Sequence, residues 1–139
     1  MKILVVEDDF ISRRLLCRYL QAVGESDVAV NGNEAIGAFK QMILSGQRYD
    51  LVCLDIMMPG MDGQETLKRL RALEAEHGID AADRSKVIMT TALEDHDNVM
   101  AAFSNACDGY VVKPIEKKKF LETLVAIGLP VPTISPQGA

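Results

Sequence analysis

Short runs of aliphatic residues alternate along the chain with longer segments of helical period. The runs occupy residues 3–6, 28–30, 51–54, 87–89 and 110–112. The first and the third contain no polar residue, which is typical of parallel strands buried on both faces. The alternation predicts an α/β protein of five βα units around a parallel sheet, with residues 3–6 and 51–54 near its centre.

In the segments that follow these runs, apolar residues recur three or four positions apart. The stripes are Ile11, Leu15, Tyr19 and Val23; Ile36, Phe39 and Ile43; Leu67, Leu70 and Leu73; Val99, Phe103 and Ala106; and Phe120 or Leu121 with Leu124 and Ile127. A stripe of this spacing lies along one face of a helix, so each predicts a helix that packs on the sheet.

Length and charge restrict the classes of protein that the sequence can encode. A chain of 139 residues has room for one compact domain, because two cores would each be very small. The formal net charge of −5 opposes a broad contact with nucleic acid or an anionic membrane. No apolar run approaches the ~20 residues of a membrane span, and no signal-peptide cleavage region precedes the first strand. We expect a cytoplasmic protein that binds neither nucleic acid nor membranes directly.

The cysteines indicate neither a disulfide framework nor a zinc site. Cys17, Cys53 and Cys107 lie far apart, with no CxxC spacing and no nearby histidine. We expect them to be small hydrophobic residues of the core.

Polar side chains follow four of the five predicted strands. The first strand is followed by Glu7, Asp8 and Asp9, the third by Asp55, the fourth by Thr90 and Thr91, and the fifth by Lys113 and Pro114. Ligand sites of parallel α/β sheets lie outside the carboxyl ends of the strands. We therefore expect these residues to line one crevice.

The chemistry of such a crevice is restricted by its charge. Several carboxylates close together repel one another, so either some stay protonated or a divalent cation binds between them. Mg²⁺ fits, because it takes oxygen ligands and often uses one or two carboxylates plus phosphate oxygens. With Lys113 as a further positive charge, Asp55 is a candidate nucleophile for a phosphoryl group, and Thr91 could hydrogen-bond a phosphoryl oxygen.

Each of these residues also has a plainer structural explanation. An aspartate such as Asp55 after a strand is usually a turn or cap residue, Thr91 could cap a loop, and Lys113 could be a solvated lysine. The acidic run at residues 7–9 could stabilise the positive end of the first helix. All four explanations would have to hold together at four corners of one crevice.

The sequence closely resembles the receiver domain of two-component response regulators over roughly residues 2–128. The resemblance rests on four motifs that occur in order and with family-like spacing. They are Val5-Val6-Glu7-Asp8; Asp55 followed by Met58-Pro59-Gly60-Met61-Asp62-Gly63; Thr91-Ala92; and Gly109-Tyr110-Val111-Val112-Lys113-Pro114. It implies a flavodoxin-like doubly wound (βα)5 fold with a parallel sheet of order 2-1-3-4-5.

The resemblance also implies a role for each matching residue. Asp55 is expected to be the phosphoacceptor. The expected Mg²⁺ ligands are Asp8 directly, Glu7 through water, Asp55, and the backbone carbonyl of Met57. Thr91, with Ala92 beside it, is expected to be the switch hydroxyl, Lys113 the phosphate-binding ammonium and Tyr110 the switch aromatic. Asp9 falls just beyond the acidic pair and is expected to be a helix N-cap.

The expected organisation is a receiver domain at residues 1–128 with a flexible tail at 129–139, where Pro130, Pro132 and Pro136 cannot continue a helix. A sensor histidine kinase or a histidine phosphotransfer protein would donate the phosphoryl group. The readout would be the face formed by the fourth helix, fifth strand and fifth helix, acting on a separate downstream protein. Such a chain catalyses only its own phosphorylation and dephosphorylation.

Three other functions share parts of this pattern. A Mg²⁺-dependent phosphatase of the aspartyl-phosphate kind usually has a second aspartate two residues after the nucleophile, where this chain has Met57. A flavodoxin-type protein needs a phosphate-cradling loop after the first strand, where this chain is acidic. An interaction module that is not phosphorylated would not need the full set of charged residues.

Overall fold

The computed structural model describes residues 1–92 and 107–131. In chain order the elements are β1 (Lys2–Val6), α1 (Phe10–Leu20), β2 (Glu25–Ala29), α2 (Gly32–Leu44), β3 (Leu51–Asp55), α3 (Gly63–Glu76), a short 3-10 helix (Ala81–Asp83), β4 (Lys86–Thr91), β5 (Gly109–Val112) and α5 (Lys117–Ala126). The fourth predicted helix, with Val99, Phe103 and Ala106, lies outside the described residues.

The five strands form one parallel sheet of order β2-β1-β3-β4-β5, which confirms the predicted fold class. The register pairs Ile3 with Leu51 and Cys53 with Ile88 along the middle of the sheet. Every residue of β3 is buried, as the uninterrupted apolar run predicts. Because all strands run in the same direction, their carboxyl ends lie along one edge of the sheet.

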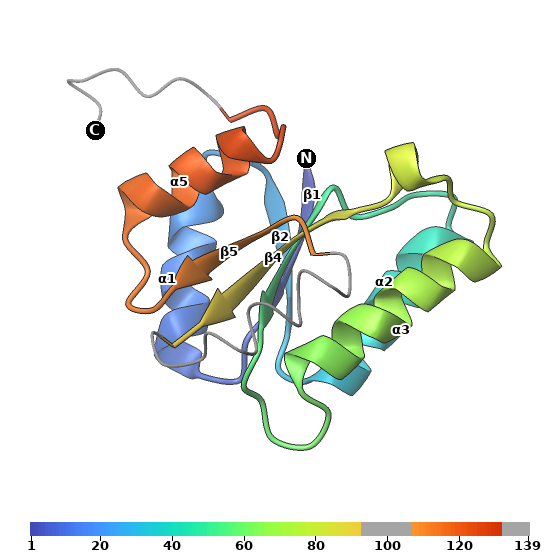
Figure 1. Ribbon diagram of the computed structural model, residues 1–139, viewed down its shortest axis with the longest axis horizontal. Helices are drawn as coiled ribbons and strands as arrows, with labels where there is room; N and C mark the ends of the chain where they lie inside the picture. Colours follow the sequence, from blue (N-terminus) through green and yellow to red (C-terminus); the bar gives the residue numbers. More distant parts are fainter. Residues whose placement is uncertain (93–106, 132–139) are drawn as a thin grey trace.

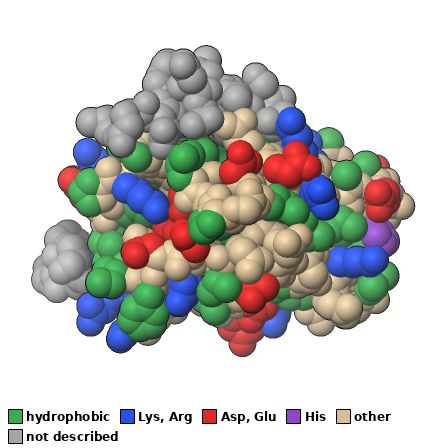
Figure 2. Space-filling model, turned by 90° about the horizontal axis from the view of Figure 1, so that it is seen from below, with side chains coloured by type: hydrophobic (Ala, Val, Ile, Leu, Met, Phe, Trp, Pro, Cys, Tyr) green, Lys and Arg blue, Asp and Glu red, His purple; other side chains and the backbone are tan. Residues whose placement is uncertain are grey.

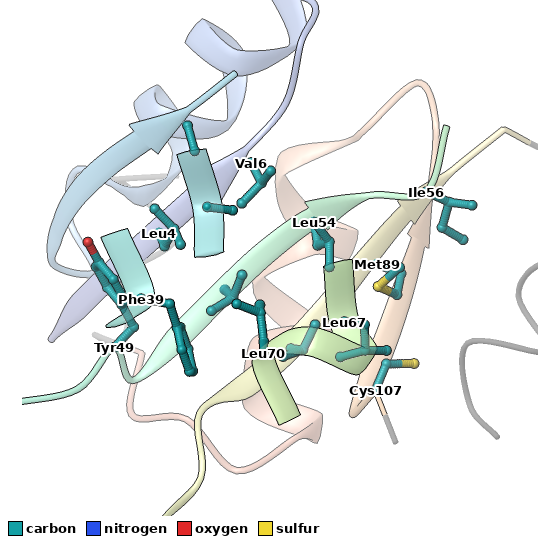
Figure 3. Packing of buried hydrophobic residues seen from close by; sticks show 14 of the residues in the cluster. Leu4, Val6, Phe39, Tyr49, Leu54, Ile56, Leu67, Leu70, Met89 and Cys107 are labelled. Atoms are coloured by element: carbon teal, nitrogen blue, oxygen red, sulfur yellow. The ribbon is translucent and has the colours of Figure 1, made fainter. Parts of the chain in front are cut away.

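Helices cover both faces of the sheet (Figure 1). Helices α2 and α3 pack on one face, where Phe39 and Leu70 contact strand residues such as Leu54 (Figure 3). Helices α1 and α5 cover the other face through Leu16, Leu20, Phe120 and Leu124. Leu129 and Val131 also lie partly buried against this second cluster, so packing continues three residues beyond position 128. No helix in the described ranges is long and apolar enough to cross a membrane.

Two local predictions differ from the structure. In α1, Ile11 is exposed and the buried positions are Leu16 and Leu20, so the predicted stripe through Ile11 is wrong. Strand β2 begins at Glu25, earlier than predicted, and Val28 is half exposed. Strand β2 is an outer strand of the sheet, so it has a neighbouring strand on one side only and need not be fully covered.

A buried polar network lies where the strands begin, at the end of the sheet opposite to their carboxyl ends. The Arg71 guanidinium in α3 lies 2.8 Å from the Glu74 carboxylate and 3.1 Å from that of Asp108, the residue before β5. Glu74 also accepts the Ser85 amide, and Asp108 accepts the Val87 amide. Buried charges need such partners, and here they fix where β4 and β5 begin.

Gly63, the first residue of α3, allows this helix to approach the end of β3. Its amide donates to the Ile56 carbonyl at 2.8 Å. A Cβ at this position would lie 2.2 Å from the Asp55 carbonyl oxygen and 2.7 Å from the Ile56 Cα. Both atoms belong to the backbone, so no side-chain rotation could relieve the clash. The backbone that carries Asp55 therefore depends on a glycine here.

We expect Gly63→Ala to destabilise the protein by about 2–3 kcal/mol, because the added methyl group must displace α3 or the end of β3. The measurement is urea unfolding followed by circular dichroism. Gly37→Ala is the matched control, since Gly37 is exposed within α2 and nothing lies within 4 Å of the position that a methyl group would take there. That variant should gain about 0.5–1 kcal/mol. Similar stability changes in both variants would contradict the close approach.

Candidate functional site

Three carboxylates converge at the carboxyl ends of β1 and β3. One carboxylate oxygen from each of Glu7, Asp8 and Asp55 lies within 4.8 Å of the others. Glu7 is fully buried, Asp55 is 4% exposed and Asp8 is exposed. This edge is on the lower side of Figure 1, and Figure 2 shows acidic, basic and hydrophobic side chains interspersed on the face seen from below.

Lys113 brings a positive charge from the end of β5. Its Nζ lies 2.7 Å from the Glu7 carboxylate and 3.5 Å from that of Asp55. Burial alone would lower the pKa of Lys113, but the hydrogen bond to Glu7 and the charge of Asp55 raise it above the ordinary value. Lys113 is therefore a stable cation that neutralises part of the acidic cluster.

One lysine does not balance the carboxylates. Burial, reinforced by a hydrogen bond to Glu7 and by the negative charge of Glu7, raises the pKa of Asp55 to about 8. Lys113 and the Met57 amide, which donates to Asp55 Oδ1 at 3.2 Å, oppose this shift only in part. Without a further cation, this raised pKa favours the protonated form of Asp55 near neutral pH.

The donor set fits a hard divalent cation. All three side chains offer carboxylate oxygens at a spacing that one ion could bridge, and neither sulfur nor imidazole takes part. Asp8 faces solvent and leaves an open side for water or a phosphate oxygen. Mg²⁺ prefers such a site, with few protein ligands and retained waters.

The turn between β1 and α1 is held by several hydrogen bonds. The Glu7 amide donates to the Ala29 carbonyl at 3.1 Å. Asp9 is the N-cap of α1 and accepts the Ser12 amide at 2.8 Å, which confirms its predicted capping role. Arg13 Nη1 donates to the Glu7 carbonyl at 3.0 Å and lies 3.5 Å from that of Asp8. Arg13 was not among the predicted site residues, because no spacing rule shows that a helix side chain turns back to a strand end.

The remaining predicted residues surround this cluster. Thr91 is buried at the end of β4, and its hydroxyl donates to the Ala92 carbonyl at 3.1 Å. Tyr110 is 43% exposed on β5, and Met57 is 59% exposed two residues after Asp55. The structure therefore brings carboxylate oxygens of Glu7, Asp8 and Asp55 within 4.8 Å of one another and pairs Lys113 with Glu7 and Asp55. The other predicted side chains lie in the adjoining strand ends and loops.

Thr90 is a further polar residue of this region. It stands opposite Asp55 in the β3–β4 register, and its hydroxyl is buried without a hydrogen-bond partner in the described ranges. The sequence places a threonine pair at the end of this strand, but only the pairing register shows which of the two is opposite Asp55.

Comparison with known proteins gives a consistent result. Residues 3–125 match the model of a family described as the response regulator receiver domain. The transcriptional regulatory protein ResD of Bacillus subtilis is 35% identical over 91% of this chain, and the regulatory protein VanRB of Enterococcus faecalis is 34% identical over 90%. The chain spans 47% and 50% of these two relatives. It spans only 7% of the hybrid signal transduction histidine kinase L of Dictyostelium discoideum.

Solved structures show the same architecture. A complex of CheX, CheY, BeF3⁻ and Mg²⁺ from Borrelia burgdorferi contains a chain that is 25% identical, with a TM-score of 0.78 over 94% of this chain and 90% of that one. The chemotaxis protein CheY4 of Vibrio cholerae is also 25% identical, with a TM-score of 0.73 over 91% of this chain and 97% of that one.

The raised pKa of Asp55 makes the stability of the metal-free protein depend on pH. A proton on Asp55 favours the folded state, so this contribution is fully present below 3.8, the ordinary pKa of an aspartate, and is lost as pH rises towards about 8. We expect the unfolding free energy of the wild type to fall by ~1–2 kcal/mol relative to Asp55→Asn between pH 6 and pH 8. Urea unfolding in EDTA measures this difference. Parallel pH profiles for the two proteins would contradict it.

Proposed function

The chain belongs to the response regulator receiver domain family, the phosphoacceptor modules of two-component signalling, and we propose that Asp55 is the residue that becomes phosphorylated. The observation that carries this proposal is the convergence of Glu7, Asp8 and Asp55 within 4.8 Å, with Lys113 against two of them. Asp55 is the member of the cluster at the tip of the central strand, and it is slightly exposed, whereas Glu7 is fully buried.

The proposed reaction is a direct phosphoryl transfer. A carboxylate oxygen of Asp55 attacks the phosphorus of a phosphohistidine on a sensor histidine kinase or a histidine phosphotransfer protein. The new O–P bond forms as the P–N bond breaks, and the electron pair of that bond leaves with the imidazole of the donor. Lys113, already 3.5 Å from the Asp55 carboxylate, is placed to stabilise the negative charge on the phosphoryl oxygens.

We propose that Mg²⁺ is held by Glu7, Asp8, Asp55 and the backbone carbonyl of Met57. When bound, the ion neutralises charge that develops on the phosphoryl oxygens. The chain itself holds the carboxylates close together, which raises the pKa of Asp55, so the attack needs a further positive charge that favours the ionised form of Asp55. Lys113 supplies part of that charge, because its Nζ lies 2.7 Å from the Glu7 carboxylate and 3.5 Å from that of Asp55.

The proposed switch uses Thr91, Ala92, Lys113 and Tyr110. A phosphoryl group on Asp55 would add a charge of about −1.5 to −2 at this edge. The Thr91 hydroxyl could then exchange its contact with the Ala92 carbonyl for a phosphoryl oxygen, and the partly exposed Tyr110 ring could move into the space that Thr91 leaves. The readout face would comprise the fourth helix, β5 and α5, of which the fourth helix lies outside the described residues.

A protein with such a readout acts through another protein, and we propose a separate downstream target. The net charge of −5 favours a protein partner over nucleic acid. The proposed receiver domain spans residues 1–128. The relatives ResD and VanRB are about twice as long as this chain, so they carry segments that it does not match.

Phosphorylation of Asp55 can be tested directly. Incubation with Mg²⁺ and a small phosphodonor such as acetyl phosphate should add the mass of one phosphoryl group to the intact protein. Asp55→Asn should abolish the gain, because an amide oxygen is a poor nucleophile, and EDTA should prevent it in the wild type. Intact-protein mass spectrometry gives the result.

Asp9→Asn is the matched control for this experiment. It removes a carboxylate from the same turn, and asparagine caps a helix as well as aspartate does. This variant should still be phosphorylated. A mass gain that persists in Asp55→Asn, or that disappears in Asp9→Asn, would contradict the assignment.

The switch predicts that Thr91→Ala separates phosphorylation from its readout. With BeF3⁻ and Mg²⁺ as a phosphoryl mimic, the wild type should show large amide chemical-shift changes at residues 109–119. Thr91→Ala should bind Mg²⁺ with unchanged affinity but lose most of these changes, and Thr91→Ser, which keeps the hydroxyl, should retain them. NMR titration measures both effects. Equal shift changes in wild type and Thr91→Ala would show that the hydroxyl is not needed.

A further inference from the structure

The structure points to a role for Arg13 that rests on the proposed Mg²⁺ site. Arg13 lies in the first turn of α1, and its guanidinium donates to the main-chain carbonyl of Glu7 at 3.0 Å and approaches that of Asp8 at 3.5 Å. We propose that Arg13 is a positioning residue, which holds the backbone of the acidic pair in the conformation that binds the cation.

The position of Asp8 depends on the backbone. Asp8 is exposed, and within the part of the chain that the structure describes no group donates a hydrogen bond to its carboxylate. Glu7, in contrast, is buried and fixed by Lys113 at 2.7 Å. The direction of the Asp8 side chain is therefore set by the turn that carries it. Arg13 contacts the carbonyls of the two peptide units that flank the Asp8 Cα, at 3.0 Å for Glu7 and 3.5 Å for Asp8.

Repulsion acts on this turn in the metal-free protein. Three carboxylate oxygens lie within 4.8 Å of one another, and Asp8 is the one that can move away into solvent. The Asp9 cap restrains the turn from its helical end, at 2.8 Å from the Ser12 amide. Arg13 restrains it at the strand end. Without Arg13, we expect the turn to open and Asp8 to leave the cluster for part of the time.

Arg14 provides an internal comparison. Arg13 and Arg14 lie over the same Phe10 ring, with guanidinium carbons 5.5 Å and 5.6 Å from the ring centroid. Arg13 is half-buried and bonds to the turn, whereas Arg14 is exposed and makes no hydrogen bond to Glu7 or Asp8. The two residues thus share their charge and their aromatic contact but differ in the contact to the acidic pair.

Whether Mg²⁺ binding weakens or strengthens when Arg13 is replaced distinguishes a positioning role from a purely electrostatic one. A guanidinium repels a cation, so removing its charge would strengthen Mg²⁺ binding if electrostatics alone decided the affinity. If the turn is instead competent for binding only part of the time, the apparent dissociation constant rises by the inverse of that fraction. Weaker binding in the absence of Arg13 therefore indicates positioning.

The experiment compares Mg²⁺ affinity by isothermal titration calorimetry in the wild type, Arg13→Gln, Arg13→Lys and Arg14→Gln. We expect Arg13→Gln to weaken binding by about fivefold or more. Arg14→Gln should stay within about twofold of wild type, because exposed charges are screened by salt. Arg13→Lys keeps the charge but has no planar fork, so its affinity should lie between wild type and Arg13→Gln. If Arg13→Gln does not fold, a weaker affinity in Arg13→Lys than in Arg14→Gln carries the test.

A second measurement needs no metal. In EDTA, ¹⁵N relaxation dispersion should show new exchange at the Asp8 and Asp9 amides in Arg13→Gln but not in Arg14→Gln. Unchanged or tighter Mg²⁺ binding in Arg13→Gln would overturn the role of Arg13. If the wild type itself binds no Mg²⁺, the proposed metal site is wrong, and the relaxation data alone test the role of Arg13. A turn in Arg13→Gln that is as rigid as in the wild type then overturns the inference. New exchange at the Asp8 and Asp9 amides supports it.

Discussion

The repulsion among Glu7, Asp8 and Asp55 is the constraint on which the rest of this site depends. Two of the carboxylates are buried, where water cannot screen them, and Lys113 neutralises only part of their charge. A protein selected for stability alone would replace them with apolar residues. The cluster instead keeps an excess of negative charge, which any added cation would stabilise. In the proposed function, the binding of a metal and the arrival of a phosphoryl group would be coupled, because each would supply the charge that the other needs.

Contacts outside the cluster hold the backbone that carries the repelling carboxylates. Parallel strands end at the same side of the sheet, so Glu7, Asp55 and Lys113 meet there although they are far apart in the sequence. The close contact between Gly63 and the backbone of Asp55 fixes the tip of the central strand. At the opposite edge, Arg71 and Asp108 fix the start of β5 and so the position at which Lys113 follows it.

Much of this arrangement could be predicted from the sequence, for a physical reason. Buried parallel strands leave uninterrupted apolar runs, and polar residues at their carboxyl ends must meet, so the sheet and the group of Glu7, Asp55 and Lys113 follow from pattern alone. The exposure of Ile11 and the early start of β2 did not follow, because they depend on what covers an edge strand and the end of a helix. Arg13 was missed because its contact is with backbone carbonyls, which are the same in every residue and leave no trace in the sequence.

The two cations near the acidic pair differ in chemistry in a way that suits different tasks. Lys113 is a point charge on a flexible stem, 28% exposed, and it contacts side chains. It can turn from Glu7 toward a new anion without breaking any backbone contact. The planar guanidinium of Arg13 instead binds main-chain carbonyls, which accept hydrogen bonds whatever the protonation of the carboxylates. A site that must both hold its geometry and respond to a new charge needs one cation of each kind. Exchanging Lys113 for arginine, or Arg13 for lysine, would remove one of these properties.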